Sequence, residues 1–323
     1  MTLKSMVLKV MGSGLNLTSL LFPRWGGQLA FRLFSTPPKP RIRPKEAVFL
    51  SAADRMDCYF ENKKIAVYSW GDPSHPYVFM AYGWAYNAGR WRYFVPPLVA
   101  AGYRVIAFDP PGHGYSDPGL VEYPLMVRLQ RQLIQQFGAP SLFLGHSFGG
   151  GCFVGTLTSL PRSLHPERIC LMGVFSEARW IFHNYRQAMG LSRRTYLRLI
   201  NTIYRRTGYR LSSFDNARQA ADLGHLPCLL IHDPEDQVVS FSNALRNHQY
   251  WPNSALYRPI GAGHHLGTKE VTQTVMAWLL EGQLPTDVTI SSGLTDAKHE
   301  LRAWFLSVEQ DTIHGRMSSQ YYA

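Results

Sequence analysis

A serine that could act as a nucleophile stands near the middle of the chain, within the pentapeptide G-H-S-F-G (145–149). The apolar run SLFLGH (141–146) leads into it, and a helical pattern follows it. A sharp strand-to-helix turn lifts a serine hydroxyl above the edge of a sheet, where a helix N-terminus favours developing negative charge. This context predicts that Ser147 is the nucleophile of an acyl-transfer reaction, whereas a lone G-x-S-x-G would equally suit an inert glycine-rich turn.

Serine chemistry also requires a general base and an acid that orients it, and two later segments offer both. The run PCLLIH (227–232) ends in D-P-E-D, and the run ALYRPI (255–260) ends in G-A-G-H-H. Both polar segments leave the C-terminal ends of predicted strands, on the side where Ser147 is expected. The sequence therefore offers Asp233 or Asp236 as the acid.

The base is expected from the second of these segments, at His264 or His265. Two other histidines lie near the expected site. His146 lies inside the G-H-S-F-G turn, and we expect its ring to pack beneath the site. His113 lies in D-P-P-G-H-G-Y-S (109–116), a glycine- and proline-rich loop that we expect to be structural.

The elements that must position these residues follow from an alternation of short apolar runs and longer helical patterns. Near-continuous apolar runs are typical of strands covered on both faces, so the alternation predicts an α/β fold with a mostly parallel, doubly wound sheet. The predicted strands are 47–50, 64–70, 77–82, 104–109, 141–146, 168–173, 227–232 and 255–260, and the predicted helices are 90–101, 121–137, 147–159, 240–250 and 268–281.

One interval interrupts this alternation, because more than fifty residues separate the predicted strands 168–173 and 227–232. A structureless loop of that length would be unusual in a compact domain. Tyr196, Ile200 and Ile203 fall at helical spacing within it. The interval therefore predicts a helical cap inserted at about 176–223.

The segment 46–281 resembles the α/β-hydrolase superfamily in its G-H-S-F-G turn, its acid loop and its histidine loop. The acid loop of that family usually reads G-x-x-D, so Asp236 matches the acid and Asp233 stands in place of the glycine. The family pattern G-x-G-H matches His264. The resemblance implies an α/β-hydrolase fold and a serine hydrolase with the triad Ser147, Asp236 and His264. Glu177 is an alternative acid, because a family variant takes its acid from the preceding strand.

The resemblance also implies an oxyanion hole made of two backbone N–H groups, those of Trp84 and Phe148. Members of the family usually have His-Gly after the corresponding strand, whereas this chain has Tyr82-Gly83-Trp84. Because the donor is backbone, the missing histidine leaves the oxyanion hole intact. We expect Tyr82 at the substrate pocket, and Trp180 of the cap to give it an apolar wall.

The function predicted from these residues is cleavage of a carboxylic ester of a small-molecule acyl substrate through an acyl-enzyme. A thioesterase or a C–C bond hydrolase would use the same groups, and a non-catalytic binding protein on this scaffold is a third alternative. Haloalkane dehalogenases and epoxide hydrolases share the family fold but carry Asp at the nucleophile position, so Ser147 argues against both. The sequence contains no dinucleotide fingerprint, P-loop or zinc-type cysteine spacing, and we expect neither a cofactor nor a metal.

The net charge of +11 is concentrated in residues 1–45, which hold eight lysines and arginines and no acid. We expect a basic helical extension with a proline-rich linker there, either in peripheral contact with a membrane or packed on the catalytic domain. The remainder is too weakly basic to predict nucleic-acid binding. The four cysteines lack paired spacing and favour a reducing, cytoplasmic location. Residues 282–323 are expected to form a polar tail with a helix at 294–309.

Overall fold

The computed structural model describes residues 3–38 and 41–290. By their contacts these residues divide into two compact units. We name them the helical unit, which holds residues 3–36 and 177–215, and the sheet unit, which holds the described residues of 37–176 and 216–290. All three residues of the predicted triad belong to the sheet unit.

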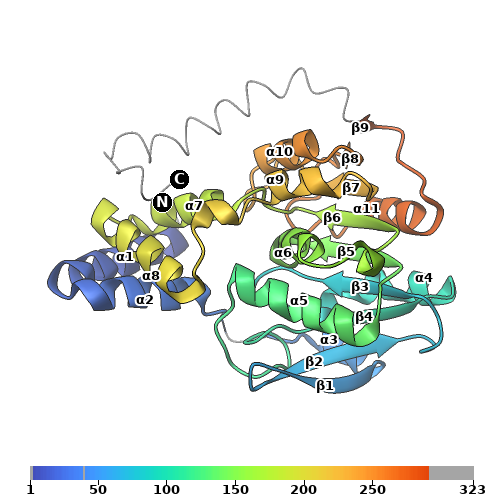
Figure 1. The fold of residues 1–323 in the computed structure, drawn as a ribbon, viewed down its shortest axis with the longest axis horizontal. Coiled ribbons are helices and arrows are strands. Elements are labelled where there is room, and N and C mark those ends of the chain that lie inside the picture. The colour runs from blue at the N-terminus through green and yellow to red at the C-terminus, as the bar shows by residue number, and fades with distance from the viewer. Residues whose placement is uncertain (1–2, 39–40, 291–323) are drawn as a thin grey trace. The chain divides into compact units, whose positions relative to one another are not determined.

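A nine-stranded sheet forms the centre of the sheet unit, with the strand order β1-β2-β4-β3-β5-β6-β7-β8-β9 (Figure 1). The six strands from β4 to β8 are parallel, whereas β1, β2 and β9 pair in antiparallel fashion at the two edges. This sheet confirms the predicted fold class. The strands are β1 (Asp54–Phe60), β2 (Lys63–Trp70), β3 (Tyr77–Ala81), β4 (Arg104–Phe108), β5 (Leu142–His146), β6 (Arg168–Met172), β7 (Cys228–Ile231), β8 (Ser254–Tyr257) and β9 (Val288–Ile290).

Helices cover this sheet on both faces (Figure 1). On one face α5, α6, α9 and α10 follow one another, each packing on the next. On the other face, Leu50, Leu98 and Val271 of α3, α4 and α11 join the strand residues in one hydrophobic core, so the central strands are buried on both sides. The helices are α3 (Pro44–Ser51), the 3-10 helix η1 (Ala88–Tyr93), α4 (Val95–Ala100), α5 (Tyr123–Phe137), α6 (Ser147–Thr158), α9 (Asn216–Ala220), α10 (Ser242–Tyr250) and α11 (Lys269–Met276).

The structure differs from the sequence-based boundaries at both ends of the sheet unit. The run AVFL (47–50), predicted as a strand, belongs to α3, which Pro44 opens and the Glu46 carboxylate caps at the Arg43 N–H. Four apolar residues are too few to separate a strand from a buried helix by pattern alone. At the other end β9 pairs with β8, so the sheet continues past residue 281. The predicted helix at 294–309 lies outside the described residues.

The helical unit is built from α1 (Leu3–Leu21), α2 (Pro23–Ser35), α7 (Ala178–Met189) and α8 (Arg193–Thr207). Helix α1 packs against the other three, and α2 packs against α8. The basic N-terminal extension and the cap insertion, predicted as separate parts of the chain, therefore share one unit. Among the described residues no helix is both long enough and apolar enough to cross a membrane.

Candidate active site

Ser147 stands on the turn between β5 and α6, with His146 as the last residue of the strand. Its backbone has φ = +50°, a left-handed conformation that is strained for a residue with a side chain. Two glycines permit the tight turn, because a Cβ on Gly145 would lie 2.5 Å from the Cα of Gly150. The first glycine of the G-H-S-F-G pattern, together with Gly150 directly after the pattern, thus reflects close backbone contact between strand and helix.

The histidine loop after β8 brings His264 to this serine. His264 Nε2 lies 3.0 Å from Ser147 Oγ, and His264 Nδ1 lies 2.7 Å from Asp236 Oδ2. An ionised carboxylate can only accept, so Nδ1 carries the proton and Nε2 is left to accept from the serine hydroxyl. The structure thus brings together the three residues predicted as a triad, in the arrangement in which a histidine can take the serine proton.

Asp236 is buried and well supplied with hydrogen-bond donors. Its Oδ1 accepts from the backbone N–H groups of Val238 and Val239. Burial alone would raise the pKa of Asp236, but hydrogen bonds from His232, His264 and the Val239 amide outweigh it and hold that pKa well below its usual value. The carboxylate therefore stays ionised beside the histidine.

The contact between His232 and Asp236 was missed in the sequence analysis. His232 Nε2 lies 3.3 Å from Asp236 Oδ2 and 2.8 Å from the Val239 carbonyl, so its Nε2–H points at two acceptors. Its position in the sequence could have indicated this contact, because His232 ends the apolar run PCLLIH and directly precedes the acid loop. It is a positioning residue for the acid.

The second carboxylate of the acid loop has different partners. Asp233 accepts from the backbone N–H of Glu235 at 2.8 Å and from that of Gly263 at 2.5 Å. The alternative acid Glu177 belongs to the helical unit, where it pairs with Arg179 at 2.8 Å. Only Asp236 is hydrogen-bonded to His264 among the three acids considered.

One further histidine supports the loop of His264. His146 lies beneath it, with its Nε2 2.8 Å from the His264 carbonyl. Burial and the nearby Arg90 hold the pKa of His146 well below its usual value, so its ring is neutral. His265, the alternative base, also has a lowered pKa, caused first by burial and then by Arg90.

The loop after β3 meets the nucleophile turn at Gly83, where a Cβ would lie 2.7 Å from the Cβ of Ser147. The indole of the next residue, Trp84, lies edge-on to the Phe148 ring, with 6.0 Å between centroids. The Phe148 N–H lies in the first turn of α6. Backbone N–H groups there have no carbonyl partner within the helix, so they can bind a ligand. Both residues expected to form the oxyanion hole thus lie beside Ser147.

Tyr82 is 1% exposed, and its hydroxyl donates to buried Asp109 at 2.7 Å. The Ala88 N–H also donates to Asp109, at 2.8 Å, so these contacts fix the loop after β3 to the turn 109–116, and Tyr68 of β2 donates to the same carboxylate. We therefore assign Tyr82 to the support of this loop in place of the expected substrate contact. Trp180 belongs to the helical unit, and its substrate contact stays a prediction.

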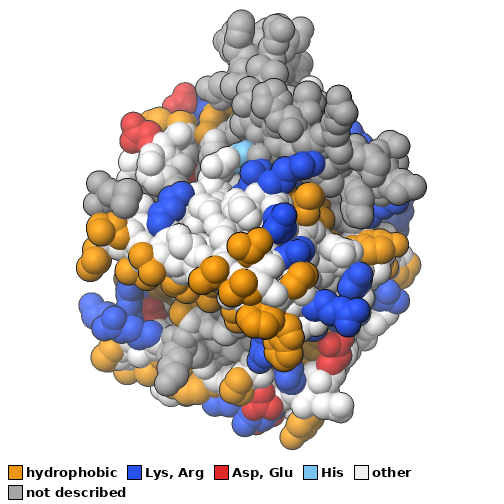
Figure 2. Space-filling view, turned by 90° about the vertical axis from the view of Figure 1, so that its left-hand side faces the viewer, with side chains coloured by type: hydrophobic (Ala, Val, Ile, Leu, Met, Phe, Trp, Pro, Cys, Tyr) orange, Lys and Arg blue, Asp and Glu red, His pale blue; other side chains and the backbone are white. Residues whose placement is uncertain are grey.

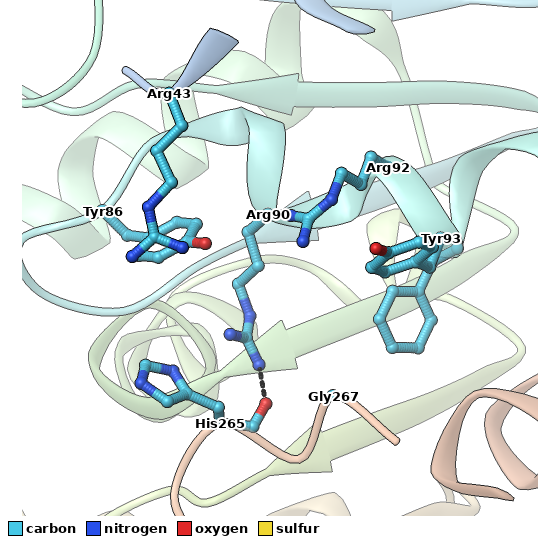
Figure 3. A pocket seen from close by; sticks show the side chains of 8 residues that line it. Arg43, Tyr86, Arg90, Arg92, Tyr93, His265 and Gly267 are labelled. Atoms are coloured by element: carbon cyan, nitrogen blue, oxygen red, sulfur yellow. Dashed lines mark hydrogen bonds between the residues drawn. The ribbon is translucent and has the colours of Figure 1, made fainter. Parts of the chain in front are cut away.

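A pocket of about 200 Å³ adjoins the histidine loop, and three guanidinium groups gather around it (Figure 3). Arg90 donates to the His265 carbonyl at 2.5 Å. The lining residues are Arg43, Tyr86, Arg90, Arg92, Tyr93, Phe94, His265 and Gly267. Among the described residues, no group of three or more histidines, cysteines, aspartates and glutamates is arranged to hold a metal ion.

Comparisons with known proteins agree with this fold. Residues 76–169 match the family described as alpha/beta hydrolase fold. "Bifunctional epoxide hydrolase 2" of Rattus norvegicus is 31% identical over 101 residues, 30% of this chain and 17% of that protein. "Pimeloyl-[acyl-carrier protein] methyl ester esterase" of Edwardsiella ictaluri (strain 93-146) is 40% identical over 92 residues, 28% of this chain and 32% of that protein. The chain thus spans less than a third of either relative.

Among solved structures, the "Thioesterase Domain From Curacin Biosynthetic Pathway" is similar, with a TM-score of 0.52 and 19% identity. The match covers 69% of this chain and 97% of that domain. The strand order, the family match and this likeness agree that the chain has the α/β-hydrolase fold.

Proposed function

We propose that the protein is a serine hydrolase that cleaves a carboxylic ester through an acyl-enzyme. The observation that carries the proposal is the hydrogen-bonded series from Ser147 Oγ to His264 and from His264 to Asp236. Such a series supplies a nucleophile, a base and a group that orients the base. The esterase and thioesterase among the similar proteins support the same chemistry.

In the first half-reaction, Ser147 Oγ attacks the ester carbonyl while His264 Nε2 takes its proton. The negative charge of Asp236 stabilises the imidazolium that forms. The oxyanion accepts hydrogen bonds from the backbone N–H groups of Trp84 and Phe148. Collapse of the tetrahedral intermediate breaks the bond to the alcohol oxygen, which receives the proton from His264.

The second half-reaction uses the same groups. Water attacks the acyl-enzyme carbonyl and gives its proton to His264, and the collapsing intermediate returns that proton to Ser147 Oγ as the acid leaves. The aromatic rings of Trp84, Phe148 and Phe175 lie next to one another beside the serine, and we assign them to an apolar surface for the acyl chain.

The direct test is covalent labelling with a fluorophosphonate probe, followed by assay of p-nitrophenyl esters and acyl-CoA thioesters of graded chain length. We expect the wild-type protein to be labelled and Ser147→Ala to be unlabelled, with kcat lowered on the order of 10³-fold or more. Ser74→Ala, an exposed serine of the same unit, is the matched control. Labelling of Ser147→Ala at the wild-type level would overturn the proposal, and faster turnover of thioesters than of esters would favour the thioesterase alternative.

A further inference from the structure

We propose that the helical unit binds the surface of an anionic lipid bilayer through the outer faces of α1 and α2. This inference concerns where the protein resides and does not depend on the proposed ester hydrolysis. It is carried by three observations within the helical unit: the solvent-facing side of α1, the residues by which α1 packs, and the distribution of charge.

The solvent-facing side of α1 is mostly apolar, with the exposed Ser13 and Gly14 between its two apolar stretches. Val10 is 72% exposed, and the exposed residues recur at the three- and four-residue spacing of a single helix face. Exposed apolar residues in such a stripe mark a binding surface. They are Leu3, Met6, Val7, Val10, Met11, Leu17, Leu20 and Leu21.

The side by which α1 packs on its neighbours holds the buried Leu15 together with the small residues Gly12 and Ser19. A Cβ on Gly12 would overlap the Met189 carbonyl of α7, and a Cβ on Gly26 of α2 would lie 2.4 Å from the Cα of Ser19. A helix on a protein surface exposed to water normally buries its large apolar side chains and exposes its polar ones. In α1 most of the large apolar residues lie on the exposed side, which is typical of a helix whose outer face contacts another apolar surface.

Polar contacts fix this orientation of α1. The Asn16 side chain donates to the Gly190 carbonyl at 2.9 Å and accepts from the Ser192 N–H at 2.8 Å. The Arg198 guanidinium donates to Ser19 Oγ at 3.0 Å. Rotating α1 to bury its apolar stripe would break these bonds, so the stripe belongs to the folded unit.

Phe22, just before α2, and Trp25 and Leu29 of α2 continue the apolar surface, and Trp25 is 70% exposed. Tryptophan is enriched where protein meets the boundary between lipid headgroups and acyl chains. Figure 2 shows hydrophobic side chains gathered on this side of the molecule, with lysine and arginine side chains among and around them.

The charge of the helical unit matches an anionic surface. Residues 3–36 and 177–215 contain twelve lysines and arginines and two acids, which amounts to +10 of the +11 net charge. Both acids, Glu177 and Asp215, are buried. The same charge argues against a second copy as the occupant, because two such faces would repel each other. An anionic bilayer offers both an apolar layer and negative headgroups.

The test is co-sedimentation of the full chain with vesicles of phosphatidylcholine alone or with 30% phosphatidylglycerol. We expect binding to the anionic vesicles that weakens at high salt. Val10→Asp is expected to lower binding at least tenfold. Val48→Asp provides the matched control, because Val48 is also 72% exposed on a helix but lies in α3 of the sheet unit.

A charge-reversing pair completes the design. Arg24→Glu of α2 is expected to weaken binding, whereas Arg162→Glu, an exposed arginine of the sheet unit with the same effect on net charge, is expected to leave it unchanged. Unchanged thermal unfolding would show that the variants fold. Equal binding by Val10→Asp and Val48→Asp would overturn the proposal. So would a wild-type dimer in analytical ultracentrifugation that Val10→Asp dissociates, which would assign the surface to a second copy.

A separate observation in the sheet unit carries a second inference. Arg90 is 8% exposed, its Nε has no hydrogen-bond partner, and none of the described carboxylates forms an ion pair with it. A buried guanidinium without a counter-charge is costly. We infer that the pocket formed with Arg43 and Arg92 binds a small oxyanion of the carboxylate or phosphate class. Arginine recognises both through its fork of N–H donors.

Titration calorimetry with inorganic phosphate and with acetate, at low salt, tests this pocket in the full chain. We expect wild type to bind at least one of the two anions. Arg92→Gln is expected to weaken binding at least tenfold, because Arg92 lines the pocket without contacting the predicted triad. Arg162→Gln serves as the control. Absence of binding to wild type, or equal binding by the two variants, would overturn the inference.

Discussion

Asp233 accepts a hydrogen bond from the backbone N–H of Gly263 at 2.5 Å, and this bond joins the acid loop to the histidine loop. It holds the segment immediately before His264, whereas the neighbouring Asp236 bonds to the His264 ring itself. Two carboxylates three residues apart thus act on the same histidine in different ways, one through the backbone and one through the imidazole.

This division predicts different consequences for two matched substitutions. Asp236→Asn should lower kcat on the order of 10⁴-fold, because an amide can favour the wrong tautomer of the histidine. Asp233→Asn should lower kcat far less and reduce the free energy of unfolding by about 1.5–3 kcal/mol, the range for a hydrogen bond to a charged group. Ester kinetics and urea unfolding measure the two effects. Equal losses of kcat would show that the acid is misassigned.

His232 should affect the rate through Asp236. His232→Phe keeps a ring of similar shape and removes the Nε2–H that lies 3.3 Å from the carboxylate. We expect kcat to fall about tenfold with KM nearly unchanged, because a hydrogen bond to a charged group contributes about 1.5–3 kcal/mol. The exposed His75→Phe is the control. A rise in KM without a fall in kcat would contradict the positioning role.

Gly83 should tolerate no side chain. Gly83→Ala places a Cβ 2.7 Å from the Cβ of Ser147, so either the serine or the loop carrying Trp84 must move. A displacement of about 1 Å at a reacting group can lower the rate on the order of 10²-fold. We expect a fall in kcat of that order. Gly14→Ala, where no atom lies within 4 Å of the new Cβ, should leave kcat unchanged.

The buried His146 should make the protein sensitive to acid. Its folded pKa lies below the unfolded value of about 6.5, so the unfolded chain binds the proton first and stability falls as pH drops below about 6.5. The slope from this one group reaches at most about 1.4 kcal/mol per pH unit. Urea unfolding between pH 7.5 and 5.5 should show a shallower slope for His146→Gln than for wild type. Parallel slopes would contradict the assignment.

The sequence was sufficient for the part of the site that depends on local pattern. Ser147, Asp236 and His264 each follow an apolar run that ends at the same sheet edge, and the chain order of the three residues could be matched to a family. The strand alternation likewise predicted the parallel sheet. Local pattern and chain order carry this information because parallel strands place their carboxyl ends at one edge.

The rest depended on contacts between distant residues. Nothing in the sequence around Tyr82 indicated that its hydroxyl would donate a hydrogen bond to Asp109. Because of this bond, Tyr82 stabilises the loop after β3, whereas the sequence had suggested a contact with substrate. The pairing of Asn16 with Gly190 joins segments about 170 residues apart, so no periodicity within the N-terminal segment could have assigned it to the cap.

The helical unit is assembled from two chain segments, and this has a consequence for biosynthesis. Helices α1 and α2 leave the ribosome before their partners α7 and α8, which are complete only after Thr207. At elongation rates of about 5–20 residues per second, the nascent apolar helices remain without partners for on the order of ten seconds. During that interval their exposed leucines and glycines are available to chaperones or to a nearby bilayer, so the order of synthesis favours early capture of α1 and α2 before the sheet is complete.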